Sequence, residues 1–475
     1  MSNAVVVGSG PNGLAAAITL AEGGLDVRVL EAADRPGGGV RSSTEILPGL
    51  VVDECSGFHP MGAGSPFFAS QHLERHGLRW RWPEIQLAHP LDDGRAAFLW
   101  RDAERTADGL GVDGAAWDRT IGWTGRRFDA LAADVLRPIV HVPRHPLSLA
   151  RFGTMALLPA STLARVFRTD EGRALFGGVA AHAFADLTLP FSAAVGVMLA
   201  GAGHAHGWPV AEGGSGAIAD ALVRRFEELG GTIETGVAVE STDHLTGADV
   251  VCLDTTPAAA AAILGDRLPS GIARAYHRFR AGPAAYKLDM AVEGPIPWAN
   301  PEVGRAGTVH LGGTFEEIVA AEAATVAGRM PARPFMLLGQ QYVADPGRSA
   351  DGLNPVYLYA HVPNGLDRDV DEVLIDGVER FAPGFRDRIR KVVATPPAAL
   401  HERNANYLGG DIAGGASSGL QVLFRPRVAV DPYATGIPGT YLCSASTPPG
   451  AGVHGMGGFN AAQRALRGGQ SRNRW

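Results

Sequence analysis

The N-terminal thirty residues alternate between short apolar runs and one amphipathic segment. Ala4–Val7 and Val27–Leu30 are rich in β-branched residues, as are strands buried on both faces of a parallel sheet. Between them, Leu14, Ile18 and Ala21 recur at helical spacing. The pattern predicts a strand, a helix and a second, parallel strand in one unit.

Three glycines, Gly8, Gly10 and Gly13, lie between the first strand and the helix and match G-x-G-x-x-G. Such glycines permit a tight turn, let the backbone approach a pyrophosphate and let the helix pack on the strand. Pro11 suits a first helical turn, and Glu31 ends the second strand near the position of an acid that binds a ribose hydroxyl. The unit predicts a dinucleotide cradle, the alternative being a strand–helix–strand unit that binds no nucleotide.

A second glycine cluster, Gly37–Gly39, follows Glu31 closely and is flanked by Arg35 and Arg41. A second backbone approach to the pyrophosphate is useful when the ligand continues towards a flavin. Here the sequence resembles the two-dinucleotide-binding-domain flavoproteins, which include phytoene desaturases, amine oxidases and retinol saturase. In that family an arginine follows the glycine doublet directly, whereas this chain has Gly39 and Val40 before Arg41. The resemblance implies Arg41 as a pyrophosphate ligand, the alternative being a solvated surface arginine.

The C-terminal segment 439–466, GTYLCSASTPPGAGVHGMGGFNAAQRAL, reads as a strand, a glycine loop and an alanine-rich helix. A helix N-terminus stabilises negative charge, such as that near N1 and O2 of a reduced flavin. The segment resembles the phytoene-desaturase-like branch, including its pyridine-nucleotide-disulfide-oxidoreductase-domain-containing members, and there it has this role. The two glycine motifs together imply FAD. The expected cofactor-binding residues are Gly8, Gly10, Pro11, Asn12, Gly13, Glu31, Ala32, Arg35, Gly38, Gly39, Val40, Arg41, Val239, Gly450, Gly452, Val453, His454, Gly455 and Met456.

A third segment returns the chain to the nucleotide-binding domain. It contains a Pro-x-x-Gly-Gly turn, an amphipathic helix and a strand, and the resemblance implies that the Val239 backbone contacts the adenine. We expect an α/β fold, a Rossmann-like FAD-binding domain with an inserted α+β substrate domain. The FAD-binding parts are 1–60, 205–265 and 401–475, and the substrate parts are the mostly helical 61–204 and the sheet-containing 266–400.

Composition restricts the function classes. The chain has 475 residues, 46% of them hydrophobic, and a formal net charge of -7, which argues against a nucleic-acid surface. It has no apolar run long enough to cross a bilayer and no signal peptide, so a cytoplasmic protein is expected. The stretch TMALLPASTLARVF reads as a core helix or, alternatively, as a lid or peripheral membrane face.

Three cysteines, Cys55, Cys252 and Cys443, are far apart in the sequence and form no CxxC pair. This argues against a redox-active disulfide and a zinc knuckle, and no metal site is predicted. Cys443 is read as a small buried residue, with covalent flavin attachment as the alternative. Gly201, Gly203 and Gly207 have the wrong spacing for a nicotinamide cradle, and Trp208-Pro209 stands where its helix would begin.

Three residues are catalytic candidates. His454 lies in the loop that the resemblance places beside the flavin, and His59 lies in a segment that approaches it; either could exchange a proton or shape a turn. Lys287 resembles the lysine that amine oxidases hold near flavin N5, the alternative being a partly exposed strand lysine. The expected reaction is desaturation of a largely apolar small molecule by hydride transfer to N5. Amine oxidation, redox-neutral isomerisation and a non-catalytic flavin-carrying protein remain open, as does the oligomeric state.

Overall fold

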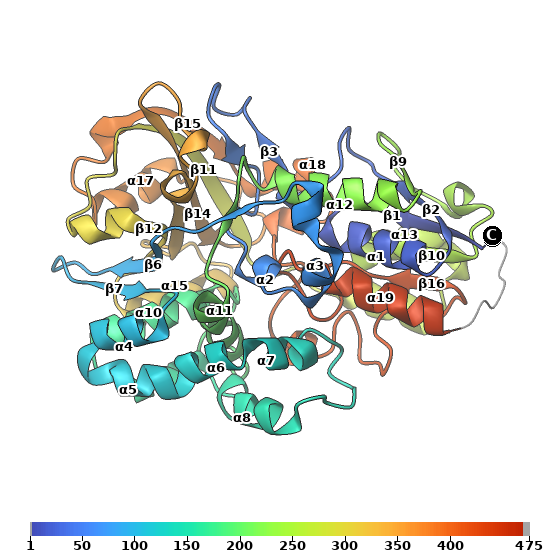
Figure 1. Cartoon of the computed structure of the whole chain (residues 1–475), viewed down its shortest axis with the longest axis horizontal. Helices are drawn as coiled ribbons and strands as arrows, with labels where there is room; N and C mark the ends of the chain where they lie inside the picture. The colour runs from blue at the N-terminus through green and yellow to red at the C-terminus, as the bar shows by residue number, and fades with distance from the viewer. Residues whose placement is uncertain (1, 469–475) are drawn as a thin grey trace.

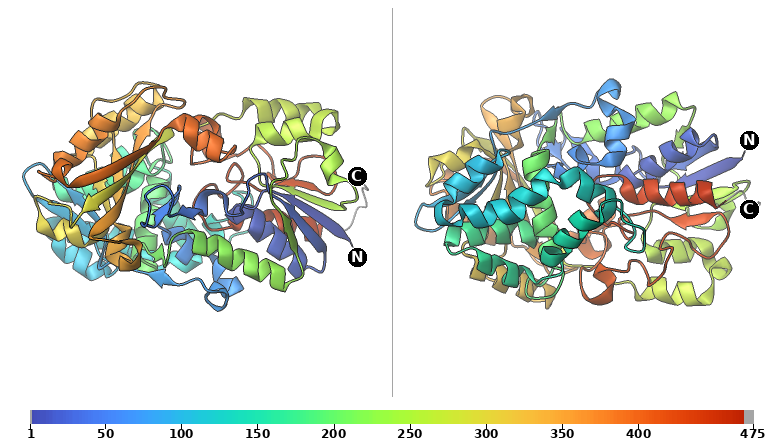
Figure 2. Two further views of the ribbon diagram at one scale, coloured as in Figure 1. Left: turned by 90° about the horizontal axis from the view of Figure 1, so that it is seen from above. Right: turned by 60° about the horizontal axis from the view of Figure 1, so that its bottom comes forward.

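The computed structural model describes residues 2–468 and contains two main sheets at opposite ends of the molecule (Figures 1 and 2). The smaller sheet has five parallel strands in the order β16-β10-β1-β2-β9. These strands are β1 (Asn3–Val7), β2 (Asp26–Leu30), β9 (Thr232–Glu234), β10 (Val250–Leu253) and β16 (Thr440–Leu442). Three separate parts of the chain thus build one Rossmann-like sheet, and the predicted fold class is confirmed.

The two faces of β1 pack against different helices because successive side chains of a strand point to opposite faces. Ala4 and Val6 belong to the same buried cluster as residues of α1 (Pro11–Glu22), α12 (Gly216–Glu228) and α19 (Met456–Arg467). Val5 and Val7 pack instead with α13 (Pro257–Leu264). The sheet is therefore covered on both sides, as the continuous apolar run predicts.

The larger sheet has seven strands in the order β15-β11-β14-β13-β12-β6-β7. All its neighbours are antiparallel except β12 and β6. Its strands are β6 (Ile85–Pro90), β7 (Ala96–Leu99), β11 (Ala284–Glu293), β12 (Ala306–Leu311), β13 (Met336–Gly339), β14 (Leu353–Val362) and β15 (Ile389–Thr395). β6 and β7 come from the part of the chain that is otherwise mostly helical, so residues 61–204 and 266–400 both contribute strands to this sheet.

A helical layer lies below the larger sheet in Figure 1. It includes α7 (Phe128–Val135), α8 (Pro146–Ala156), α10 (Asp170–Ala181) and α11 (Ala193–Ala205), and the short helix α2 (Pro60–Ala63) is drawn above α7. Gly201 and Gly203 lie inside α11, where a Cβ on Gly201 would come within 2.6 Å of Thr124, so these glycines serve close helix packing. No helix within residues 2–468 is long and apolar enough to cross a membrane.

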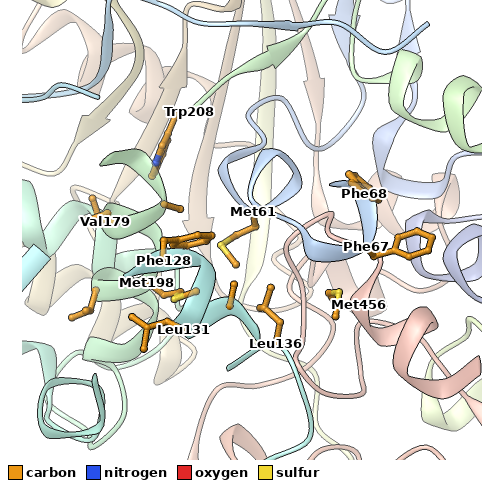
Figure 3. Packing of buried hydrophobic residues seen from close by; sticks show 14 of the residues in the cluster. Met61, Phe67, Phe68, Phe128, Leu131, Leu136, Val179, Met198, Trp208 and Met456 are labelled. Atoms are coloured by element: carbon orange, nitrogen blue, oxygen red, sulfur yellow. The ribbon is translucent and has the colours of Figure 1, made fainter. Parts of the chain in front are cut away.

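One buried apolar cluster joins the nucleotide-binding part to the helical layer. Figure 3 shows part of it, with Met61 of α2, Phe128 of α7, Met198 of α11 and Met456 at the start of α19. Each of these side chains is less than a tenth exposed. The start of α19 is therefore held by packing against both parts.

Candidate functional site

The first glycine loop has the backbone geometry of a phosphate cradle. Gly8 has a φ of 95°, in the region that favours glycine. A Cβ on Gly13 would lie 2.1 Å from the Gly8 carbonyl oxygen, so only glycine permits this approach of α1 to β1. Pro11 is in the first turn of α1, where its missing N–H costs no hydrogen bond. The N-terminus of α1 and its loop thus fit a dinucleotide pyrophosphate.

Asp254, the residue directly after β10, supports this glycine loop, a role that was not predicted from the sequence. Its Oδ2 accepts the Gly13 N–H at 2.9 Å, which replaces the side-chain cap that Gly10 cannot supply. Burial, together with the nearby Glu31, raises the pKa of Asp254 to about 7, against the opposing effect of the Gly13 hydrogen bond. No local motif marks this residue because it lies far along the chain from the loop that it contacts.

Glu31 is buried at the carboxyl end of β2, beside the loop. Its carboxylate accepts the Ser9 N–H at 2.8 Å, the Ser9 hydroxyl at 2.5 Å and the Ala33 N–H at 2.9 Å. Val237 donates its N–H to the Glu31 carbonyl oxygen. Val239 lies beyond β9, which ends at Glu234, so the expected strand position of Val239 is wrong; its contact with an adenine stays a prediction.

The second glycine cluster lies directly against the first. Gly37 donates its N–H to the Ser9 carbonyl, and a Cβ on Gly38 would lie 3.0 Å from the Gly10 Cα. A Cβ on Gly39 would lie 2.2 Å from the hydroxyl of Tyr407, which reaches this cluster from the far segment 404–415. The two predicted cradles therefore form one continuous surface.

The other predicted residues near this cluster differ in exposure. Arg41 is half-buried and donates from Nε to the Gly38 carbonyl, whereas Arg35 is exposed and forms an ion pair with Glu54. Val40 is buried and Ala32 is exposed. The structure thus holds Arg41, and not Arg35, against the glycine doublet.

The C-terminal loop brings a second helix N-terminus to the same place. A Cβ on Gly458 of α19 would lie 1.7 Å from the carbonyl oxygen of Asn12, so α19 and α1 begin in direct backbone contact. Gly450, Gly452 and Gly455 have φ of 108°, 149° and 69°. Val453 has a φ of 53°, which is costly for a β-branched residue and is typical of functional loops.

His454 is buried in this loop, and burial lowers its pKa to about 4. Its Nδ1 accepts the Met456 N–H at 3.1 Å, which assigns the ring proton to Nε2. Nε2 has no hydrogen-bond partner within residues 2–468. The Ser65 hydroxyl donates to the His454 carbonyl at 2.6 Å and ties the loop to the segment after α2. His454 therefore presents a free N–H donor.

His59 precedes α2 and belongs to a buried polar network. Its Nε2 lies 2.8 Å from the Ser215 hydroxyl, which itself donates to the Ser56 carbonyl, so the ring proton is assigned to Nε2 of His59. Nδ1 then carries a free lone pair and has no partner in the described part of the chain. Burial lowers the pKa of His59 to about 4, against the opposing effect of Asp53.

The network continues through the backbone of Ser215 to two buried ion pairs. Asp53 accepts the Ser215 N–H at 2.6 Å and pairs with Arg348 at 2.6 Å, and Arg348 also pairs with Asp345 at 3.2 Å. The pKa of Asp53 is lowered, because Arg348 and the hydrogen bonds outweigh the opposing effect of burial. Sequence reasoning missed these residues because no local spacing connects them.

Lys287 on β11 is buried, so the alternative of a partly exposed strand lysine is wrong. It is one of only two lysines in the chain. Its ammonium group pairs with Asp289 and lies 4.8 Å from the ring centroid of Tyr357, whose hydroxyl donates to the Cys55 carbonyl. Burial raises the pKa of the Cys55 thiol, which is hydrogen-bonded to Tyr407. Lys287 is thereby connected to the glycine doublet through Tyr357, Cys55 and Tyr407.

Cys252 and Cys443, far apart in the sequence, meet at the ends of neighbouring strands β10 and β16. Burial raises the pKa of the Cys443 thiol, as does its hydrogen bond with Cys252. Both residues are buried free thiols, and the third cysteine, Cys55, is also free. Spacing along the chain therefore did not reveal this pair.

Comparisons with known proteins first define the class. The family model described as "NAD(P)-binding Rossmann-like domain" matches residues 6–69, which include both glycine clusters. The putrescine oxidase structure with bound putrescine superposes with a TM-score of 0.63 at 18% identity, covering 98% of each chain. The predicted Rossmann-like class is thus confirmed, and the chain shares its overall fold with putrescine oxidase.

Two curated proteins are more specific relatives. The chain is 25% identical to the mouse (Mus musculus) pyridine nucleotide-disulfide oxidoreductase domain-containing protein 2, over 98% of this chain and 93% of that protein. It is 29% identical to hydroxyneurosporene desaturase of Cereibacter sphaeroides, over 50% of this chain and 49% of that protein. The predicted resemblance is confirmed, the chain is similar to oxidoreductases, and these findings are consistent with FAD as the cofactor.

Proposed function

We propose that this chain is an FAD-dependent oxidoreductase that removes two hydrogens from a C–C bond of a largely apolar small molecule. The observation that carries the proposal is the pair His59 and His454. Both are buried: His454 lies within the C-terminal glycine loop, and His59 lies next to Gly62, which packs against Val453 of that loop. His59 presents a free nitrogen lone pair and His454 a free N–H. The glycine loops, Glu31 and the N-termini of α1 and α19 would hold FAD, which would supply the hydride acceptor.

The two histidines divide the work of moving protons. One substrate hydrogen leaves as a hydride and the neighbouring one as a proton, which the Nδ1 atom of His59 accepts. A pKa of about 4 keeps His59 neutral at pH 7, so this lone pair is available before the reaction. The Nε2–H of His454 would donate a hydrogen bond to the negative charge that develops near N1 and O2 of a reduced flavin. The Lys287 ammonium on β11 is paired with Asp289, so its catalytic role stays a prediction.

The face of β14 that carries Tyr357 and Tyr359 supports an apolar substrate. These rings lie 5.8 Å apart, and Phe184 stacks on Tyr359 at 6.4 Å. They form a buried cluster with Leu337 and Leu400. Such rings offer large apolar surface and few hydrogen bonds, as suits a hydrocarbon-rich molecule. The predicted apolar substrate, domain limits and cytoplasmic location stay predictions.

The test begins with the purified protein and its visible spectrum. We expect the purified protein to contain bound flavin. Apolar compounds with C–H bonds next to a conjugated system should reduce this flavin, and oxygen should reoxidise the reduced flavin slowly. His59→Gln should slow flavin reduction by a factor of about 100 to 10,000, the range for a lost general base. The exposed His401→Gln is the matched control and should leave the rate unchanged.

Other outcomes separate the alternatives. Fast reoxidation by oxygen, with reduction by amines, would favour an amine oxidase. Substrate conversion without net flavin reduction would indicate an isomerase. Absence of flavin after purification, and after addition of FAD, would overturn the proposal. For Lys287→Met, the chain offers the exposed Lys391→Met as a matched control.

A further inference from the structure

The segment 135–169 has an unusual charge composition. It contains five arginines and no aspartate or glutamate, in a chain whose formal net charge is -7. A second segment, 412–430, also lacks acidic residues and contains Arg425 and Arg427. Both segments therefore carry only positive formal charge, against the overall sign of the protein.

The same two segments carry most of the exposed large hydrophobic side chains. Nine of the fourteen such side chains in the described part of the chain belong to them. Val142 and Leu147 are each 87% exposed, Val430 is 76% exposed and Leu420 is 67% exposed. Scattered exposed hydrophobics are ordinary, but their concentration in two short segments marks an interaction surface.

The two segments meet in space. Pro138, Ile139 and Val140 of the first line one shallow hollow together with Leu423 and Phe424 of the second. Pro448, in the loop before α19, lines it too. Figure 1 shows α8 along the lower edge of the molecule, on the side opposite β15, and the right-hand view of Figure 2 turns this edge forward. We name the surface of segments 135–169 and 412–430 the basic apolar patch.

The five arginines of segment 135–169 have no ion-pair partner in the described part of the chain, whereas Arg425 of the second segment is buried near Asp411. The pKa of Arg137 is lowered by burial and by the nearby charges of Arg144 and Arg467, against the opposing effect of Asp134. The Asp134 carboxylate is buried and accepts the backbone N–H groups of Arg144 and His145, and both His141 and His145 face it.

We propose that the basic apolar patch docks on an anionic membrane surface, with Val142 and Leu147 entering the interface and the arginines meeting lipid phosphates. Exposed apolar side chains among unpaired arginines are the features of a peripheral membrane-binding surface. A second copy joined by a two-fold axis fits less well, because it would place arginines of one patch against those of the other. The proposal does not depend on the proposed function.

The test is flotation of the full-length, flavin-loaded protein with vesicles. Vesicles of equal parts phosphatidylglycerol and phosphatidylcholine should bind the protein at 0.1 M salt, and phosphatidylcholine alone should not. Each arginine near an anionic surface changes the partition coefficient by about fivefold, so Arg144→Glu with Arg151→Glu should lower it at least tenfold. Val142→Asp with Leu147→Asp should do the same by removing the inserted side chains.

Val112→Asp with Val373→Asp is the matched control, since both valines are exposed outside the patch. It should bind as the wild type does, and all variants should keep the wild-type flavin spectrum and melting temperature. Equal binding to both vesicle types, no binding, or binding that the patch variants leave unchanged would overturn the proposal. If the patch variants instead turn a dimer into a monomer, the patch is an interface between copies.

Discussion

Asp254 offers the sharpest test of how the glycine loop is supported. It is buried, and its carboxylate accepts the Gly13 N–H at 2.9 Å while no cation pairs with it in the described part of the chain. Replacing it by asparagine keeps an oxygen acceptor at the same place and removes the charge. The change therefore isolates the cost of burying a carboxylate beside the loop.

The size of the effect follows from the pKa of Asp254, which burial raises from 3.8 to about 7. The folded protein holds this proton to a higher pH than the unfolded chain does. The stability from the neutral carboxyl is therefore full below about pH 4 and is lost as the pH rises through 7. A shift of about 3 units corresponds to about 4 kcal/mol.

The assay is thermal unfolding of the flavin-free protein from pH 5 to pH 8. From pH 5 to pH 8, Asp254→Asn should gain about 3 kcal/mol of stability relative to the wild type, since only about 2 of the 3 pH units lie in this range. This corresponds to roughly 3 °C in a chain of this size. Asp266→Asn removes an exposed carboxyl and should show no such trend. A difference between Asp254→Asn and wild type that stays constant from pH 5 to pH 8 would refute the reasoning.

Three further predictions concern stability and cofactor binding. Gly13→Ala should abolish flavin binding, since its Cβ would lie 2.1 Å from the Gly8 carbonyl oxygen. The visible absorbance of the purified variant measures its flavin content, and a variant that still binds flavin would contradict the prediction. Arg348→Met should cost about 3 to 5 kcal/mol in denaturant unfolding because it leaves buried Asp53 without its cation, whereas a loss below 1 kcal/mol would show that the pair is dispensable. Burial lowers the pKa of His182 to about 3, so protonation of this residue in the unfolded chain lowers the free energy of unfolding as the pH falls below 6.5, by about 3 kcal/mol at pH 4. His182→Gln should therefore lose less stability in acid than the wild type does. An unchanged dependence of the unfolding free energy on pH would contradict this prediction.

Short-range patterns predicted the cradle well. Gly8, Gly10 and Gly13 lie within one turn between a strand and a helix, where their roles depend on neighbours in the sequence. The glycine loop before α19 was predicted for the same reason. The boundary of β9 was not, since Val239 lies in irregular chain after that short edge strand.

The sequence by itself determined the dinucleotide cradle, the two helix starts and the continuous apolar run that buries β1 on both faces, because turns and hydrophobic patterns are local properties of the chain. Only the tertiary structure decided that Asp254 caps the loop at Gly13 and that Tyr407 reaches Gly39. It also decided that His59 presents an unpartnered nitrogen lone pair and His454 an unpartnered N–H. These contacts join residues hundreds of positions apart. The geometry of these contacts depends on how whole helices and strands pack together, so the spacing of residues along the sequence does not predict it.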